Sequence, residues 1–122
     1  MQPVCLIIGA GAGIGGHAAK RFAQGGYHAA LCRRTDQQGL DQLVATIESS
    51  GGSASGYLLN AVEENTIEER IRTVEAEVGP IEVVIYNLGA QIGDRALEDT
   101  PAKVFELGWR MGTFGLFRTA QT

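Results

Sequence analysis

The chain has 122 residues, of which 44% are hydrophobic and 20% charged, a composition typical of one soluble globular domain. Its net charge of −4 and the lack of a Lys/Arg block exclude nucleic acid as a bulk electrostatic partner. No apolar run approaches the ~18 residues of a membrane span, and no basic segment precedes the first apolar run as in a secretory signal. We therefore expect a cytoplasmic protein that does not contact a membrane.

The N-terminal segment predicts a strand, a tight turn and a helix. Residues 4–8 are an apolar run that ends in a glycine-rich stretch, and an amphipathic segment follows over residues 17–24. Such a turn places free backbone N–H groups and the positive end of a helix dipole at one point, which suits a pyrophosphate. The alternative is a glycine-rich turn that holds no ligand.

The glycines of this turn fit two spacings. Those at 11, 13 and 16 match G-x-G-x-x-G, but this pattern starts two residues beyond the apolar run. Those at 9, 13 and 15 give a longer spacing that starts directly at the strand end. In the helix that follows, we expect an apolar face of Ile14, Ala18 and Phe22, and an end at residues 25–26.

Strands and helices then alternate along the chain. We expect strands over residues 27–32, 54–59 and 81–86, and a capping box at Thr35 to Gln38 before the second helix. The second and third helices show clear apolar stripes, at Leu40, Leu43, Val44 and Ile47 and at Ile67, Ile71, Val74 and Val78. A last helix follows Thr100-Pro101, with a bend expected near Gly108 or Gly112.

This alternation predicts one α/β domain over residues 1–122, a Rossmann-like, doubly wound parallel sheet with helices on both faces. Right-handed crossovers and the glycine turn after the first strand imply the spatial order 3-2-1-4, with strands numbered along the sequence. A ligand crevice should then lie beyond the carboxyl ends of the first and fourth strands. Cys5 and Cys32 fall on different strands, so we expect buried free thiols. His17 and His28 have no metal-ligand spacing around them, and we expect no metal.

Three motifs resemble those of the short-chain dehydrogenase/reductase family. The glycine spacing is similar to Thr-Gly-x-x-x-Gly-x-Gly, with Ile8 in the Thr position. Tyr86-Asn87-Leu88-Gly89 resembles Asn-Asn-Ala-Gly, and Leu59-Asn60-Ala61 resembles an Asp-Val segment whose acid meets the adenine. The resemblance implies the N-terminal, cofactor-binding half of the family's fold. It implies cofactor contacts from Gly9, Gly11, Gly13, Ile14, Gly15, Arg33, Arg34, Asn60, Ala61, Asn87 and Gly89.

The end of the second strand decides which cofactor is expected. A carboxylate there would accept a hydrogen bond from the ribose 2′-OH and select NAD, but this chain has Cys32-Arg33-Arg34. Because a guanidinium suits a 2′-phosphate, we expect NADP(H). The alternative is that both arginines are solvated surface residues. Asn60 has two interpretations of equal weight, a contact to an adenine edge or a helix cap.

The residues that would carry catalysis in the resembled family are missing. Residues 112–117 are similar to the family's Asn-x-x-Gly-x-Phe, but Gly112 stands where that Asn would hold a water of a proton relay. The catalytic Ser and the Tyr-x-x-x-Lys pair have no counterpart in these 122 residues. We therefore expect no catalytic residue in this chain and no turnover from it alone. We interpret the domain as incomplete at its C-terminus, with residues 81–85 as an apolar edge strand that a missing half or a partner would cover.

Together these features favour an NADP(H)-dependent short-chain oxidoreductase that transfers hydride between its cofactor and a small-molecule carbonyl/alcohol pair. The resemblance also implies a homo-oligomer, a dimer or a tetramer. A rival hypothesis, consistent with Gly112 and the missing catalytic residues, is a non-catalytic dinucleotide-binding or interaction protein. A third is a Rossmann-like domain with an unrelated role.

Overall fold

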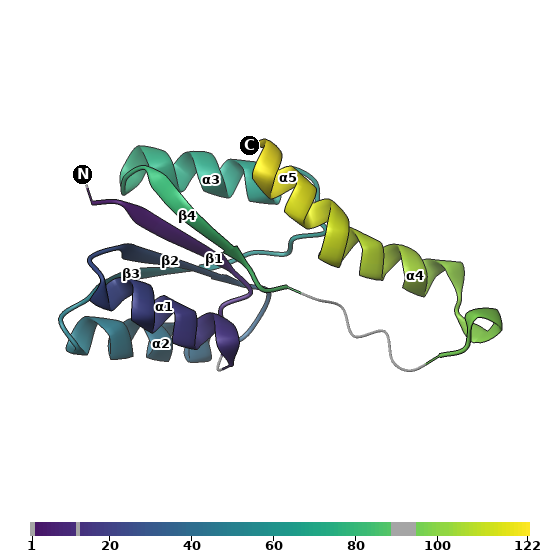
Figure 1. Ribbon diagram of the computed structural model, residues 1–122, viewed down its shortest axis with the longest axis horizontal. Coiled ribbons are helices and arrows are strands. Elements are labelled where there is room, and N and C mark those ends of the chain that lie inside the picture. Colours follow the sequence, from purple (N-terminus) through teal and green to yellow (C-terminus); the bar gives the residue numbers. More distant parts are fainter. Residues whose placement is uncertain (1, 12, 89–94) are drawn as a thin grey trace.

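A single parallel sheet organises the chain. The computed structural model describes residues 2–11, 13–88 and 95–122. Its strands are β1 (Val4–Ile8), β2 (His28–Arg33), β3 (Ser53–Leu58) and β4 (Ile81–Tyr86), in the order β3-β2-β1-β4 (Figure 1). All pairs are parallel, which confirms the predicted order and fold class.

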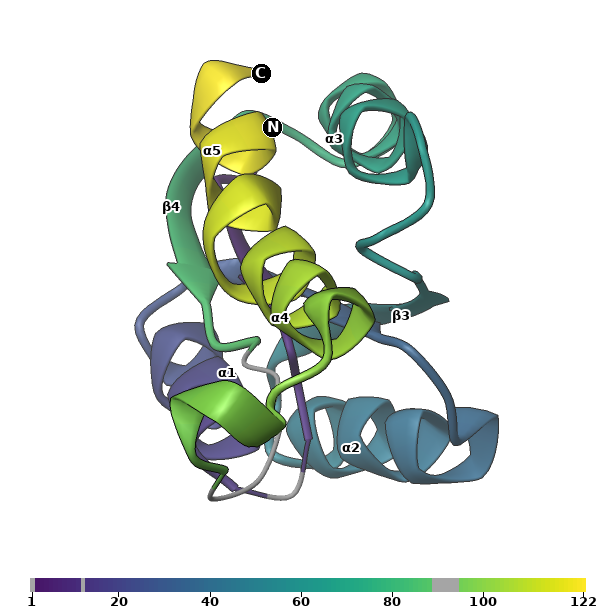
Figure 2. The same ribbon diagram turned by 90° about the vertical axis from the view of Figure 1, so that its right-hand side faces the viewer.

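Helices cover both faces of the sheet. Figures 1 and 2 show α1 (Ile14–Gln24) and α2 (Gln37–Ser49) on one face, with α3 (Thr66–Glu77) and α5 (Gly115–Gln121) on the other. Because successive side chains of a strand point to opposite faces, β1 supplies both cores. Val4, Leu6 and Ile8 pack toward α3, whereas Cys5 and Ile7 pack toward α1 and α2. All five residues of β1 are buried.

The two cysteines lie in different cores, as free buried thiols. Cys32 of β2 faces α3, and Cys5 of β1 faces the α1–α2 layer. Burial raises the pKa of the Cys5 thiol to about 11 and that of Cys32 to about 12, because a thiolate loses its hydration there. The expectation of free thiols is therefore confirmed, and both serve as small apolar core residues.

The buried face of α1 differs from the predicted one. Ile14 is 75% exposed, and the buried residues are Gly15, Gly16, Ala19 and Ala23. Small side chains let the helix approach the sheet closely. Of the predicted face, Phe22 packs partly against the same core. In α2 and α3 the predicted stripes are correct, with Leu40, Ile47, Ile67, Ile71 and Val74 buried.

The cap of α2 also lies one residue from its predicted position. Asp36, and not Thr35, is the N-cap, and its Oδ1 accepts a hydrogen bond from the Gly39 N–H at 3.0 Å. Asp36 has a φ of 68°, in the left-handed region that Asp and Asn tolerate best among non-glycine residues. The capping box expected from Thr35 and Gln38 therefore does not form.

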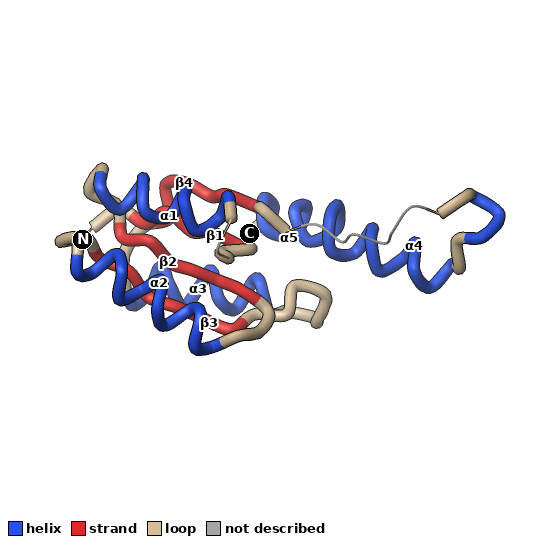
Figure 3. The backbone as a smooth tube through the Cα atoms, turned by 90° about the horizontal axis from the view of Figure 1, so that it is seen from below, coloured by secondary structure: helices blue, strands red, loops and turns tan. Residues whose placement is uncertain are grey.

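The C-terminal segment is a nearly continuous helix whose centre is irregular. A short 3₁₀ turn (Leu97–Asp99) precedes α4 (Ala102–Trp109), a π-helical segment (Arg110–Phe114) and α5. The irregularity includes Gly112, one of the two positions where we expected a bend. Figures 1 and 3 show α4 projecting beyond the carboxyl ends of the strands, while α5 lies beside α3.

β4 is an edge strand, as expected. It pairs with β1, and in the described part of the chain no strand pairs with its other side. Val84 at its centre is 43% exposed. An apolar parallel strand of this kind is usually covered on both sides.

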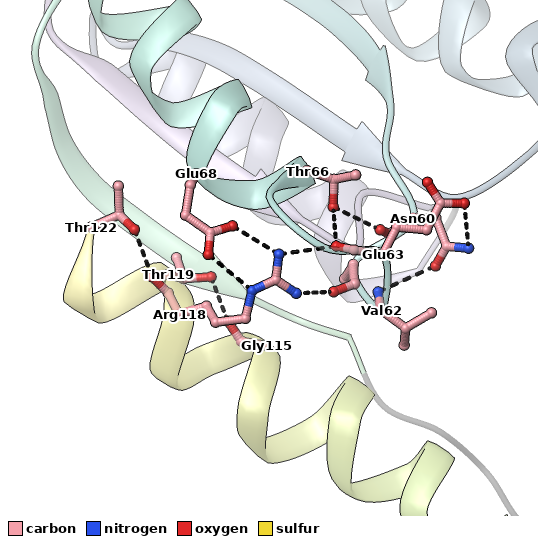
Figure 4. Close-up of polar contacts among 10 residues, drawn as sticks. Asn60, Val62, Glu63, Thr66, Glu68, Gly115, Arg118, Thr119 and Thr122 are labelled. Carbon is pink, nitrogen blue, oxygen red and sulfur yellow. Dashed lines mark hydrogen bonds and ion pairs between the residues drawn. The ribbon is translucent and has the colours of Figure 1, made fainter.

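Arg118 fixes α5 to the rest of the fold. Its Nη2 and Nε donate to the two carboxylate oxygens of Glu68 on α3 at 2.8 and 3.1 Å. Nη1 donates to the carbonyl oxygen of Ala61 at 2.6 Å and Nη2 to that of Glu63 at 3.0 Å (Figure 4). These bonds lower the pKa of Glu68 and raise that of Arg118. The Arg118 side chain is 8% exposed and that of Glu68 22%, so this is a largely buried, hydrogen-bonded ion pair.

Replacing Arg118 tests this role. Arg118→Met should lower the free energy of unfolding by about 3 kcal/mol, because it leaves a carboxylate and two carbonyl groups without their donor. Arg110→Met is the matched control, since Arg110 forms an exposed pair with Glu106 at 3.1 Å and should cost at most about 1 kcal/mol. Urea unfolding of both variants at pH 7 measures the difference. Equal losses would contradict the anchoring role.

Candidate functional site

The glycine turn after β1 is held by main-chain contacts. The N–H groups of Gly9 and Ala10 both donate to the carbonyl oxygen of Cys32 at the end of β2, at 2.8 and 2.9 Å. Gly9 has a φ of +100°, and a Cβ there would strike the carbonyl oxygen of Asn87 just after β4. The Asn87 N–H in turn donates to Ile8 O at 2.8 Å. The ends of three strands therefore meet at this turn without intervening side chains.

Two further glycines let α1 begin directly against the turn. A Cβ at Gly15 would collide with the carbonyl oxygen of Gly9, and one at Gly16 with that of Gly11. Gly9, Gly15 and Gly16 therefore serve close packing of the backbone. Gly16 was absent from the predicted contact residues, although one of the two sequence spacings contained it.

Gly11 and Gly13 differ from the packing glycines. A Cβ added at either would meet no heavy atom of the described chain within 4 Å. Gly13 is the N-cap of α1, with no side-chain cap bond and no acidic residue in the first turn, within the described residues 13–24. Ile14 stands exposed beside them. The turn thus has open space next to the positive end of a helix, an arrangement that can hold a phosphate group.

The two arginines after β2 have different surroundings. Arg33 is the last residue of β2, and its guanidinium lies 3.6 Å from Asp36 Oδ2 with a side-chain exposure of 25%. Arg34 is exposed. Arg33 ends β2 and Arg34 follows it, so both lie at the carboxyl edge of the sheet beside the glycine turn, where an arginine can bind an anionic group.

Asn60 and Ala61 lie in the loop after β3. Asn60 Oδ1 accepts from the Val62 N–H at 3.2 Å, and Nδ2 donates to Glu63 Oε1 at 3.4 Å. This side chain caps the turn ahead of α3, whereas Asn65 is the N-cap of the helix itself. Ala61 is buried, and its carbonyl oxygen accepts from Arg118. The loop is therefore held in place, and the second N–H of the Asn60 amide can still reach a ligand.

At the end of β4, Asn87 is exposed and Leu88 packs partly on the α3 core. Gly89 lies outside the described residues. Tyr86 departs from the resembled motif. Its hydroxyl donates to Met111 O and lies against Gly115, which joins β4 to the C-terminal helical segment. Burial raises the pKa of the Tyr86 phenol.

Gly112 lies in the π-helical segment, and a Cβ there would meet no described heavy atom within 4 Å. Side chains larger than hydrogen therefore fit at this position. Single π-turns in helices frequently occur at functional sites. Two contacts of the C-terminal helical segment were not predicted from the sequence, those of Arg118 and of the Tyr86 hydroxyl. Neither shows a local signal, because their partners are 50 and 25 residues away.

Among the described residues, no group of His, Cys, Asp or Glu side chains could hold a metal ion. Within the same residues, no helix has the length and apolar character needed to cross a membrane.

The parallel sheet, its order β3-β2-β1-β4 and the glycine turn between β1 and α1 define a Rossmann-type domain. The family model described as short chain dehydrogenase matches residues 3–122, and the chain belongs to this family. The family uses nicotinamide dinucleotide cofactors.

Individual relatives agree with this assignment. A fatty acyl-CoA reductase of Acinetobacter baylyi is 35% identical over 117 residues, 94% of this chain and 39% of the relative. A 3-oxoacyl-[acyl-carrier-protein] reductase of Thermotoga maritima is 35% identical over 86 residues, 70% of this chain and 35% of the relative. The chain thus spans well under half the length of these relatives.

Solved structures show the same fold. A short-chain dehydrogenase from Rhodopseudomonas palustris superposes with a TM-score of 0.90 at 32% identity, covering 98% of this chain and 55% of that one. A short-chain dehydrogenase/reductase from Serratia marcescens reaches a TM-score of 0.92 at 16% identity, covering 98% of this chain and 48% of that one. The second likeness shows the fold alone.

The open glycines give the first test of the site. Gly13→Val should leave the domain folded, because its Cβ enters open space, and should abolish measurable binding of NADH and NADPH, because the branched side chain fills that space. Fluorescence titration gives the affinity, and circular dichroism reports the fold.

Gly15→Val is the matched variant at a packing glycine. It should unfold or strongly destabilise the domain, since the added Cβ meets the backbone of Gly9. Unchanged dinucleotide affinity in a folded Gly13→Val protein would contradict the phosphate-binding role of the turn.

Proposed function

We propose that the protein is an NADP(H)-dependent short-chain oxidoreductase that interconverts a small-molecule carbonyl and the corresponding alcohol, and that this chain forms its cofactor-binding half. The observation that carries the proposal is the open space at Gly11 and Gly13, beside the uncapped start of α1. A nicotinamide cofactor, when bound, supplies the hydride. The reductase names of the two relatives support a carbonyl substrate.

The residues of the glycine turn would bind the cofactor's pyrophosphate through backbone N–H groups. Gly11, Gly13 and Ile14 would contact it, while Gly9 and Gly15 keep the strand ends and α1 close enough to form the turn. Neither α1 nor its cap offers a carboxylate that would repel the phosphates. Because Gly11 and Gly13 have no side chains, the space beside the turn stays open for the pyrophosphate.

The rim around the turn would bind the remaining parts of the cofactor. Arg33 and Arg34 would pair with the 2′-phosphate, which favours NADP(H) over NAD(H). Asn60 and Ala61 would border the adenine, with the remaining N–H of the Asn60 amide as a donor. Asn87 and Gly89 would approach the cofactor at the end of β4.

The proposal extends to partners and location. We propose a cytoplasmic homo-oligomer, a dimer or tetramer, with neither nucleic acid nor a membrane as partner. Large apolar side chains exposed along α4 and α5 support self-association, since such patches usually mark contact surfaces. They are Phe105, Leu107, Trp109, Leu116 and Phe117.

A second candidate function is a non-catalytic dinucleotide-binding or interaction protein. It is favoured by Gly112, which has no side chain to hold a relay water. Both functions use the same cofactor site and differ only in turnover.

Turnover therefore separates the two candidates. The 122-residue chain alone should oxidise no NADPH with a panel of ketones and aldehydes, because no Tyr/Lys pair is present to move the proton. The protein at its natural length should consume NADPH and form alcohol in equal amounts, followed by absorbance and product analysis. Tight NADPH binding without turnover at natural length would favour the non-catalytic function. Stoichiometric turnover by the 122 residues would refute the expected inactivity of this chain.

Arg33→Ala tests the choice of cofactor. Loss of one hydrogen bond to a charged group costs about 1.5–3 kcal/mol, so NADPH should bind roughly 10- to 150-fold more weakly. NADH binding should change little, because NADH has no 2′-phosphate. Arg21→Ala, in the last turn of α1 and away from the glycine turn, controls for the loss of one positive charge. Equal affinities for NADH and NADPH that neither variant shifts would overturn the NADP(H) assignment.

A further inference from the structure

Arg33 does not extend freely into solvent. Its guanidinium lies across the first turn of α2, with Nη2 3.6 Å from Asp36 Oδ2. The Asp36 carboxylate is itself fixed, since its other oxygen accepts the Gly39 N–H at 3.0 Å as the helix cap. The end of β2 and the start of α2 are therefore joined through this carboxylate.

Gly39 leaves the space in which this pair lies. A Cβ added at Gly39 would come within 2.9 Å of Arg33 Nη1 and would collide with Asp36 Oδ2. Both atoms are at the ends of flexible side chains, so a larger residue would displace the pair and leave the backbone in place. Glycine is the weakest helix former after proline, so its presence inside α2 has no benefit for the helix itself.

The contact leaves Arg33 able to bind a ligand. At 3.6 Å the pair is an ion pair and not a hydrogen bond, and a guanidinium has five N–H donors. Asp36 cannot swing out to accept a ribose hydroxyl without giving up its cap. The carboxylate therefore orients the guanidinium without occupying its donors.

We propose that Asp36 and Gly39 are positioning residues that hold the Arg33 guanidinium over the first turn of α2 and thereby set the preference for a 2′-phosphorylated dinucleotide. This inference rests on the proposed function and deepens it. It makes the preference depend on two residues that need not touch the cofactor.

Gly39→Ala is the sharper of two tests. Fluorescence titration of the protein at its natural length gives the ratio of the NADH to the NADPH dissociation constant. This ratio should fall at least about 3-fold, which corresponds to the free energy of a partly exposed ion pair. The melting temperature should change little, because the higher helix propensity of alanine offsets a weakened Asp36 cap. Gln38→Ala, an exposed position on the same turn, should leave the ratio unchanged.

Asp36→Asn separates orientation from charge repulsion. Asparagine is as good an N-cap as aspartate and tolerates the same positive φ, but it lacks the charge that attracts Arg33. If Asp36 orients Arg33, the ratio should fall about 3-fold. If Asp36 only repels the phosphate, the ratio should rise, which would overturn the inference.

Arg33→Ala, measured alongside, distinguishes this inference from the proposed function. If Arg33→Ala abolishes the preference while Gly39→Ala and Asp36→Asn leave it intact, the positioning role is wrong and the NADP(H) assignment stands. If Arg33→Ala also leaves the ratio unchanged, both are wrong. A fall in the ratio for all three variants, with normal melting temperatures, supports both.

Discussion

The close contact of main-chain segments at the end of β1 is the constraint on which the rest of this structure depends. β2, β4 and the start of α1 all meet the Gly9 turn through backbone atoms, and the glycines at 9, 15 and 16 leave no room for a Cβ. This contact fixes where the strands end relative to the helix dipole of α1. A ligand site can form here because Gly11 and Gly13, between the packing glycines, face open space.

A second constraint positions the loop after β3, at the same edge of the sheet as the glycine turn. The loop after β3 has no strand to hold it, and Arg118 supplies bonds to the carbonyl groups of Ala61 and Glu63. The same guanidinium pairs with Glu68 at the start of α3. Arg118 therefore joins α5 both to α3 and to the loop after β3. Tyr86 adds a bond from β4 to the π-helical segment, which brings Gly112 into a fixed relation with the sheet.

Features that several residues define together were predictable from the sequence, whereas features that depend on a single residue were not. The strand order and the stripes of α2 and α3 were predictable because several large apolar residues define each. The buried face of α1 was not, because glycine and alanine carry little hydrophobic signal. Thr35 and Asp36 are both residue types that cap helices, and the bond from the Gly39 N–H to the Asp36 carboxylate identifies Asp36 as the cap. In the candidate site, the glycine turn was predictable from its spacing, whereas Arg118 looks like any helical surface arginine.

The contrast between Arg118 and Arg33 shows why burial, and not residue type, indicates a cation's role. The Arg118 guanidinium donates to both carboxylate oxygens of Glu68 and to two carbonyl groups, so its donors are used within the fold and cannot bind a ligand. Among the residues that the structure describes, Arg33 pairs with Asp36 at 3.6 Å and is partly exposed, so donors of its guanidinium remain for an anion. A chain with a net charge of −4 can therefore carry a locally cationic rim. This rim lies at the carboxyl edge of β2, beside the glycine turn that can hold a second anionic group, so one elongated, doubly anionic ligand would satisfy both.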